Sequence, residues 1–314
     1  MKSEIRKDYV QEKYVIIAPK RGGRPSEYKP EPETAGRSTC FFCPENIQKK
    51  EIIQLVKTKK PWEIAVLKNK FPAVSLDNPK AYGLQEVIVE TPHRSRQLEE
   101  LPVSHLVKLL KTYADRTRDI LKQKKIQYLL IFKNNGGRAG ASIRHAHSQI
   151  FATAFIPPHL RDKSEKVLEY KLRYGTCVYC DVIKRERLGP RLVAELDGVI
   201  AFTPYASIHN YEIWILPTRH LDNITDLNLN ELRSWAIILK KILEAISRLG
   251  LSYNFYFHEV VFDENQHLYM KITPRGSVWA GVEIGSGIII NPIAPEEAAR
   301  YYRRQFKTNG LSIH

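Results

Sequence analysis

The alternation of hydrophobic and polar positions predicts a similar order of elements in each half of the chain. In the first half, residues 64–67 and 86–90 are rich in β-branched side chains and bounded by turn formers, which predicts strands. Residues 102–122 repeat hydrophobic side chains at helical spacing. Residues 128–133 form a short apolar run, and strand character resumes at 149–154 after a glycine-rich segment.

The second half repeats this order. Strands are predicted at 199–202, 212–216, 253–258 and 268–272, and a helix at 228–249. Two prolines and a charged, helical segment that ends near Tyr174 connect the halves. We therefore expect an α+β protein of two tandem domains with one fold, residues 1–158 and 159–314, each a mainly antiparallel sheet with a packed helix.

Composition narrows the class of protein. The 314 residues are 43% hydrophobic, enough for packed cores, and no run approaches the roughly 20 apolar residues of a membrane span. The charged N-terminus lacks the apolar core of a signal peptide, so we expect a cytoplasmic protein with no membrane partner. The net charge of +15 favours anionic ligands, but the basic residues are scattered among acidic ones, which is typical of a solvated surface.

All four cysteines fall into two Cys-x-x-Cys pairs, and each pair precedes two well-separated histidines. One pair alone would also suit redox chemistry, and buried structural cysteines with unrelated histidines are the simpler alternative. Two pairs in matched contexts favour two Cys₂His₂ zinc sites, and four protein ligands leave no open position, so both ions would be structural. The expected ligands are Cys40, Cys43, His93 and His145 in the first half, and Cys177, Cys180, His220 and His267 in the second.

Only the first half keeps a second histidine and a glutamine after its last ligand. Alternate residues of a strand share a face, so His145, His147 and Gln149 are expected to point the same way. With His145 on a metal, His147 is left as a fixed imidazole beside the glycine-rich segment 134–142, whose backbone N–H groups can approach a phosphate. A neutral imidazole can attack phosphorus and form a covalent phosphoramidate, with Gln149 as an uncharged donor to a phosphate oxygen.

With the His-x-His-x-Gln strand, the chain resembles galactose-1-phosphate uridylyltransferases, the transferase branch of the histidine-triad superfamily, over nearly its whole length. The resemblance implies two histidine-triad-like domains and a ping-pong exchange of UMP between UDP-glucose and galactose 1-phosphate, to give UDP-galactose, through uridylyl-His147. It also implies that the main-chain carbonyl of His145 orients the ring of His147. Positions that match nucleotide or phosphate contacts are Arg21, Arg24, Asn69, Phe71, Asn134, Gly140, Ser142 and Gln149. Glu283 matches a sugar-hydroxyl ligand that the family supplies across a dimer interface, which implies a homodimer.

Several departures from the family pattern leave the substrate open. Tyr269 and Lys271 stand where histidines of an iron site might be expected, so we predict no such site. The pair Cys177 and Cys180 resembles the twin-zinc members, which include ADP-glucose phosphorylases, so an adenylyltransferase is the alternative function. A zinc protein that binds nucleic acid is a distant alternative, because the histidines lie far beyond zinc-finger spacing. The preferred hexose 1-phosphate is not determined by these motifs.

Overall fold

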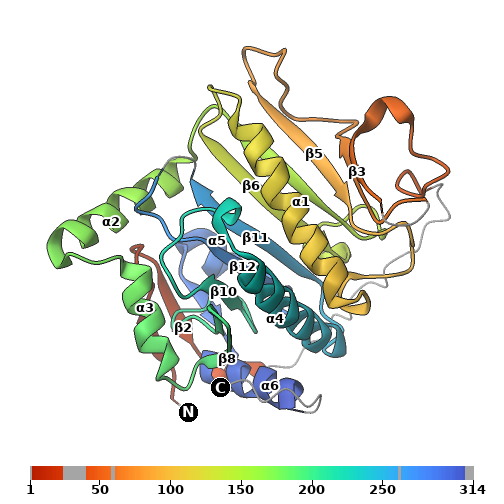
Figure 1. Cartoon of the computed structure of the whole chain (residues 1–314). Helices are drawn as coiled ribbons and strands as arrows, with labels where there is room; N and C mark the ends of the chain where they lie inside the picture. Colours follow the sequence, from red (N-terminus) through yellow and green to blue (C-terminus); the bar gives the residue numbers. More distant parts are fainter. Residues whose placement is uncertain (1, 24–39, 58–60, 261–262, 308–314) are drawn as a thin grey trace.

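A ten-stranded antiparallel sheet runs through the computed structural model, which describes residues 2–23, 40–57, 61–260 and 263–307 (Figure 1). Its order is β3-β4-β5-β7-β6-β11-β12-β10-β9-β8. The first half supplies β3 (Ile52–Val56), β4 (Ile64–Lys68), β5 (Gly83–Val89), β6 (Tyr128–Asn135) and β7 (His147–Thr153). The second half supplies β8 (Leu192–Leu196), β9 (Val199–Phe202), β10 (Ile213–Pro217), β11 (Tyr253–Val260) and β12 (Tyr269–Pro274).

The two halves join along β6 and β11. These strands pair antiparallel, with Tyr253 opposite Asn135 and Val260 opposite Tyr128. From β6 outward the order is β7, β5, β4, β3, and from β11 outward it is β12, β10, β9, β8. Corresponding strands of the two halves thus occupy equivalent positions, and the sheet has an internal pseudo-twofold arrangement. The expected α+β class with an antiparallel sheet and a packed helix in each half is confirmed. The two sheets are, however, continuous, because pairing β6 with β11 satisfies backbone groups that two separate edges would expose.

Two long helices cover one face of the sheet. They are α1 (Val103–Leu121) and α4 (Leu229–Arg248), which lie against each other (Figure 1). The apolar stripe predicted for α1 is buried, including Leu106, Leu110 and Tyr113. The Asn228 side chain accepts hydrogen bonds from the first turn of α4, which fixes where that helix begins. The opposite face of the sheet is not covered by these two helices.

The remaining elements surround the second half. The helices are α2 (Pro158–Tyr174), α3 (Val178–Arg187), α5 (Gly281–Ser286) and α6 (Pro295–Lys307). A small second sheet holds β1 (Glu4–Lys7), β2 (Tyr14–Ile17) and β13 (Ile289–Asn291), with β2 in the middle. The boundary expected after residue 158 lies at the start of α2. Within the described ranges, every helix is too short or too polar to cross a membrane.

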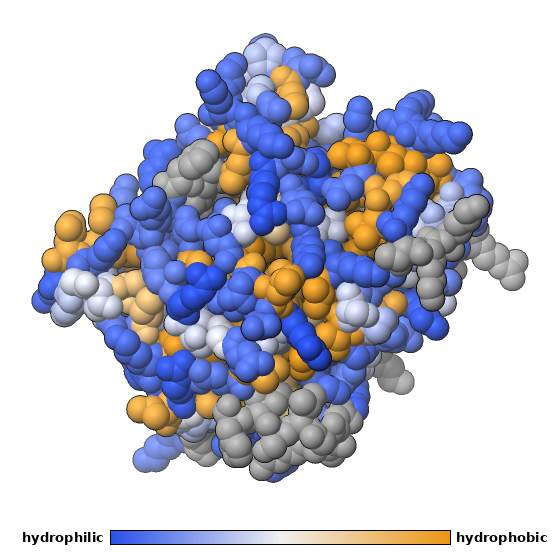
Figure 2. All heavy atoms as spheres, viewed as in Figure 1, coloured by the Kyte–Doolittle hydropathy of each residue, from blue (hydrophilic) through white to orange (hydrophobic). Residues whose placement is uncertain are grey.

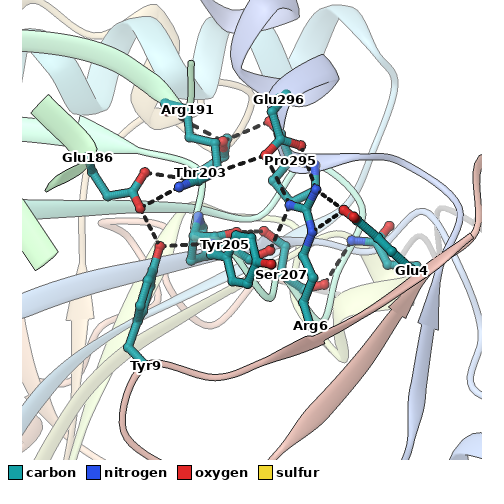
Figure 3. Close-up of polar contacts among 12 residues, drawn as sticks. Glu4, Arg6, Tyr9, Glu186, Arg191, Thr203, Tyr205, Ser207, Pro295 and Glu296 are labelled. Carbon is teal, nitrogen blue, oxygen red and sulfur yellow. Dashed lines mark hydrogen bonds and ion pairs between the residues drawn. The ribbon is translucent and has the colours of Figure 1, made fainter. Parts of the chain in front are cut away.

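A buried ionic network ties the N-terminal segment to α3 and α6 (Figure 3). Arg191 forms hydrogen bonds to Glu186 at 2.7 and 2.9 Å and to Glu296 at 2.8 Å. Arg6 reaches the same Glu296 at 3.0 Å, and the Tyr9 hydroxyl donates to Glu186 at 3.0 Å. Because each carboxylate is shared, these contacts hold residues 4–9 firmly against the second half.

The surface on the helix-covered side is mostly polar. Figure 2 shows hydrophobic side chains gathered at the outer end of α2, on the left of the view. Leu172 in this part of α2 is 80% exposed. Polar residues cover much of the remaining visible face, as the composition led us to expect.

Candidate active site and metal centres

The first Cys-x-x-Cys pair lies against the start of β7. Sγ of Cys40 is 3.3 Å and Sγ of Cys43 is 3.9 Å from Nδ1 of His145. In a tetrahedral zinc site, bond lengths of about 2.3 Å to sulfur and 2.0 Å to nitrogen place these atoms about 3.6 Å apart. Nε2 of His145 donates to the Thr91 carbonyl at 2.7 Å, which leaves Nδ1 as the acceptor. The donor set and its orientation therefore fit zinc.

His93, the fourth expected ligand, is placed outside this group. The three ligand atoms of Cys40, Cys43 and His145 lie within 4.8 Å of one another, and His93 is not among them. Its side chain is exposed, two residues beyond the Thr91 carbonyl that His145 contacts. His93 as a ligand stays a prediction.

The second pair forms a comparable group with His220. Sγ of Cys180 is 3.7 Å from Nδ1 of His220, and Nε2 of His220 is 2.9 Å from the Glu264 carbonyl. Cys177, Cys180 and His220 form the second group of mutually close ligand atoms in the described chain. A hydrogen bond with Cys180 is the main cause that lowers the pKa of Cys177 to about 4, which favours the thiolate.

His267, the fourth expected ligand of the second centre, lies near His220 but is not among the three mutually close ligand atoms. Its ring centroid is 5.4 Å from that of His220. Nδ1 of His267 is 3.0 Å from the Leu268 carbonyl, while its buried Nε2 has no hydrogen-bond partner among the described residues. A buried nitrogen without a partner is costly, and burial lowers the pKa of His267, which keeps the ring neutral. The neutral ring keeps a lone pair for a metal, and His267 as the fourth ligand stays a prediction.

His147 is the candidate nucleophile. Its Nδ1 donates to the main-chain carbonyl of His145 at 2.8 Å, the contact that the family resemblance implied. This hydrogen bond fixes the tautomer and leaves the lone pair on Nε2. Burial lowers the pKa of His147 to about 4, and the nearby Lys133 ammonium adds to the effect. The Phe42 ring lies 5.0 Å from the imidazole, centroid to centroid. A neutral imidazole held in this orientation is suited to act as a nucleophile at neutral pH.

Strand register places His147 and Gln149 on the face away from the helices. Ser148, between them, points toward α1 and accepts a hydrogen bond from the Tyr113 hydroxyl at 2.8 Å. Side chains alternate along a strand, so both neighbours of Ser148 point to the open face. Gln149 lies opposite Phe132 of β6 and is partly exposed. A substrate on this face would meet both residues.

A buried ion pair supports the nucleophile from the helix-covered side. Nζ of Lys133 lies 2.6 Å from Glu90 and 3.2 Å from the main-chain carbonyl of His147. Both charged side chains are almost fully buried. The sequence does not predict this pair, because Lys133 ends an apolar run and Glu90 ends a predicted strand, positions that ordinarily face water. The only available signal was a charge within each hydrophobic segment.

The glycine-rich segment forms a turn at the end of β6. Gly136 and Gly140 have φ of 83° and 80°, a region that residues with a Cβ rarely adopt. The Asn254 amide donates to Asn134 at 2.7 Å and to the Ala139 carbonyl at 2.8 Å. Gly140 and Ser142 are exposed, as a phosphate contact requires.

The other predicted substrate residues that the structure describes lie in exposed segments. The Asn69 side chain accepts from the backbone N–H of Phe71 at 2.9 Å, while the Phe71 ring is 82% exposed. The Glu283 side chain in α5 accepts a hydrogen bond from the Ala280 N–H. This hydrogen bond is the main cause that lowers the pKa of Glu283, and the positive charge of Arg21 adds a smaller effect. Arg24 lies outside the described residues.

Comparisons with known proteins agree with this geometry. The family model "Galactose-1-phosphate uridyl transferase, N-terminal domain" matches residues 74–157, which include α1, the glycine-rich segment and the His-x-His-x-Gln strand. A galactose-1-phosphate uridylyltransferase of Thermotoga maritima is 26% identical, over 96% of this chain and 98% of that protein. The chain is similar to galactose-1-phosphate uridylyltransferases over nearly its whole length. The resemblance predicted from the sequence is confirmed.

This family likeness extends to a phosphorylase. An ADP-glucose phosphorylase of Arabidopsis thaliana is 28% identical, over 96% of this chain and 92% of that protein. The crystal structure of an ADP-glucose phosphorylase from the same plant, with bound ADP-glucose, has a TM-score of 0.85 at 27% identity and covers 96% of this chain and 99% of that one. Uridylyltransferases and an adenylyl relative therefore share the architecture of this chain.

Proposed function

We propose that the chain is a nucleotidyltransferase that exchanges UMP between UDP-glucose and galactose 1-phosphate through a covalent intermediate on His147. The observation that carries the proposal is the hydrogen bond from Nδ1 of His147 to the His145 carbonyl, because it leaves Nε2 as a neutral nucleophile. The similarity to uridylyltransferases supports the type of reaction. The open face of β7 supports the location of the substrate beside His147 and Gln149.

The reaction has two balanced steps. Nε2 of His147 attacks the α-phosphorus of UDP-glucose, a P–N bond forms, and the P–O bond to glucose 1-phosphate breaks. A phosphate oxygen of galactose 1-phosphate then attacks the same phosphorus, and the P–N bond breaks to give UDP-galactose. Gln149 and the N–H groups of the segment from Gly136 to Gly140 would hold the non-bridging oxygens, on which charge builds up.

We propose two structural zinc ions per chain, held by the eight predicted ligands. When bound, a zinc at the first centre fixes His145, and through the His145 carbonyl it fixes the orientation of His147. The second centre has Tyr269 and Lys271 where the first has His147 and Gln149, so its role would be stability alone. Thiolate ligands persist best in a reducing compartment, which supports a cytoplasmic location.

We also propose a homodimer that shares its sites. Around α5, apolar side chains face water, including Val278 at 86% and Ile284 at 75% exposure. Glu283 lies in the same segment, so a partner that covers this surface would receive Glu283 near its own bound sugar. Sedimentation of the wild type and of an Ile284→Glu variant tests this: a dimer that becomes a monomer and loses activity agrees with shared sites.

An ADP-glucose phosphorylase is the second candidate, favoured by the Arabidopsis relative and by the second Cys/His centre. Intact mass after mixing with one nucleotide sugar alone decides between them. An adduct of one UMP from UDP-glucose, mapped to His147 and removed by galactose 1-phosphate, agrees with the leading proposal. An AMP adduct from ADP-glucose, removed by inorganic phosphate, replaces it with the phosphorylase. Turnover with both substrates but no adduct contradicts the covalent route.

A further inference from the structure

A cavity lies on the face of the sheet away from α1 and α4, over the second half. Its volume is ≈ 520 Å³, within the range of small-molecule sites. Strands β6, β11 and β12 form its floor, the first turns of α2 form one wall, and residues 8–13 reach its rim. His147 and Gln149 are not among its lining residues, although Asn134 borders both regions.

A lysine occupies a core position in the wall of this cavity. The buried residues of α2 are Leu160, Lys163 and Val167, one stripe at helical spacing, and the central one is a lysine. Nζ of Lys163 donates to the Tyr269 hydroxyl at 2.6 Å and lies 5.3 Å from the centre of the Tyr179 ring. Among the described residues, no carboxylate forms an ion pair with Lys163.

Burying an ammonium without a counter-charge costs several kcal/mol. A hydroxyl and aromatic ring faces compensate only part of that cost, since neither carries a full negative charge. Burial lowers the pKa of Lys163 to about 7; the Asp8 carboxylate opposes this shift, and the positive charges of Lys271 and Lys13 add to it. An anion in the cavity would supply the missing counter-charge.

The other charges that line the cavity add to the excess of positive charge. Lys13 and Arg275 face it beside Lys163, and Lys271 is already paired with Glu212 at 2.8 Å. Asp8 is the one lining carboxylate among the described residues, and it accepts the backbone N–H groups of residues 10 and 11 at 2.9 Å. Among the described lining residues, Lys163, Lys13 and Arg275 therefore share one carboxylate, that of Asp8.

The cavity is built as a rigid site. Trp214 and Tyr269 stack at 4.8 Å between centroids and present flat apolar surface beside the lysine. The rim is held through the network of Figure 3, in which the Tyr9 hydroxyl contacts Glu186 and the Tyr205 N–H. The Gln11 side chain also donates to the His159 carbonyl of α2 at 3.1 Å.

We propose that this cavity is a second ligand site, which binds the phosphate group of a small phosphorylated molecule through Lys163, Lys13 and Arg275. Aromatic surface beside the cations suits a sugar or base attached to that phosphate. The site goes beyond the proposed transfer reaction, because it lies at the position in the second half that corresponds to the nucleophile in the first: Tyr269 begins β12 as His147 begins β7.

Calorimetric titration of the zinc-loaded protein with inorganic pyrophosphate, at low ionic strength, tests the proposal. We expect two classes of site per chain. In Lys163→Met, the affinity of one class of site for pyrophosphate should fall at least about 10-fold, which is the effect of losing a charge-assisted hydrogen bond. Uridylyl transfer and the melting temperature should stay close to wild type. Lys166→Met is the matched control, because Lys166 lies on the same helix outside the cavity lining and should titrate as wild type.

A Lys163→Met protein that binds pyrophosphate as the wild type does, or a wild type with a single class of site, overturns the proposal. If Lys163→Met does not fold, the exposed Lys13→Met decides: weaker binding of one class supports the site, and unchanged binding overturns it. A competition experiment distinguishes an organic phosphate ligand from the inorganic ion. It measures whether glucose 6-phosphate displaces pyrophosphate from the class of site that is weakened in Lys163→Met.

Discussion

Nδ1 of His147 donates to the main-chain carbonyl of His145 at 2.8 Å. The two histidines are two residues apart, yet they have opposite uses: His145 turns Nδ1 toward two sulfurs, and His147 uses Nδ1 to fix its own ring. A change in the position of His145 therefore changes the direction of Nε2 of His147. The proposed metal centre and the proposed nucleophile are coupled through one peptide carbonyl.

We predict that His147→Ala lowers exchange by at least about 10³-fold, because the nucleophile itself is removed. The melting temperature and zinc content should stay close to wild type, since His147 is not a ligand. Steady-state exchange and metal analysis of the same preparation check this. Near-normal turnover, or loss of zinc, would contradict the assignment.

His145→Ala should lose one zinc equivalent, stability and activity together, because a structural zinc contributes directly to folding. His267→Ala is the matched variant of the second half. It should also lose one equivalent and stability, but its residual folded fraction should retain exchange per active site. Metal analysis and the burst of glucose 1-phosphate measure both quantities. Full zinc content in either variant would remove that histidine from the ligand set.

His93→Ala tests the ligand that the structure leaves outside its group. If His93 is the fourth ligand, zinc at the first centre should be released to a chromophoric chelator at least about 10-fold faster. Zinc at the second centre is the internal control and should be released at the wild-type rate. Identical release from both proteins would mean that His93 is not a ligand.

Lys133→Met should destabilise the protein by about 3–5 kcal/mol, because it leaves the Glu90 carboxylate buried without its partner. The double variant Lys133→Met, Glu90→Gln should recover part of that loss, since both charges are then gone. Urea unfolding of the three proteins measures the free energies. A single variant as stable as wild type would show that the pair does not operate as a buried ion pair.

Acid should destabilise the protein partly through His209. Burial is the main cause that lowers the pKa of His209 to about 3, so the folded state keeps the ring neutral while the unfolded state binds a proton below about 6.5. Stability is then full above pH 6.5 and falls as pH drops toward 3. His209→Phe, which keeps the stacking on Trp279, should flatten this dependence in urea titrations between pH 4 and 7. An unchanged slope would contradict it.

Much of the sheet was predictable because its strands are local and strongly patterned. Residues 199–202 agree with β9, and α1 and α4 each differ from expectation by one residue at each end. β7 begins two residues before the predicted strand because pairing with β5 extends to His147. The small sheet was not predicted: β13 pairs with β2 from the far end of the chain, and no local pattern encodes such a contact.

The site was predictable where residue type determines chemistry, as for the cysteines and the His-x-His-x-Gln strand. It was not predictable where a common residue acquires its role from burial. Lys163 looked like part of a charged connecting helix, and Lys133 like the polar end of a strand. Only the packing of distant segments shows that both ammonium groups are buried.

The pairing of β6 with β11 has a consequence for symmetry. Two identical chains joined at such a seam would carry the same residues at both equivalent positions. Here one polypeptide supplies both sides, so His147 at one position and Tyr269 at the other can coexist in every molecule. A chain that contains both units can therefore use the two equivalent positions for different functions. A homodimer of single units cannot, because both of its chains have the same sequence.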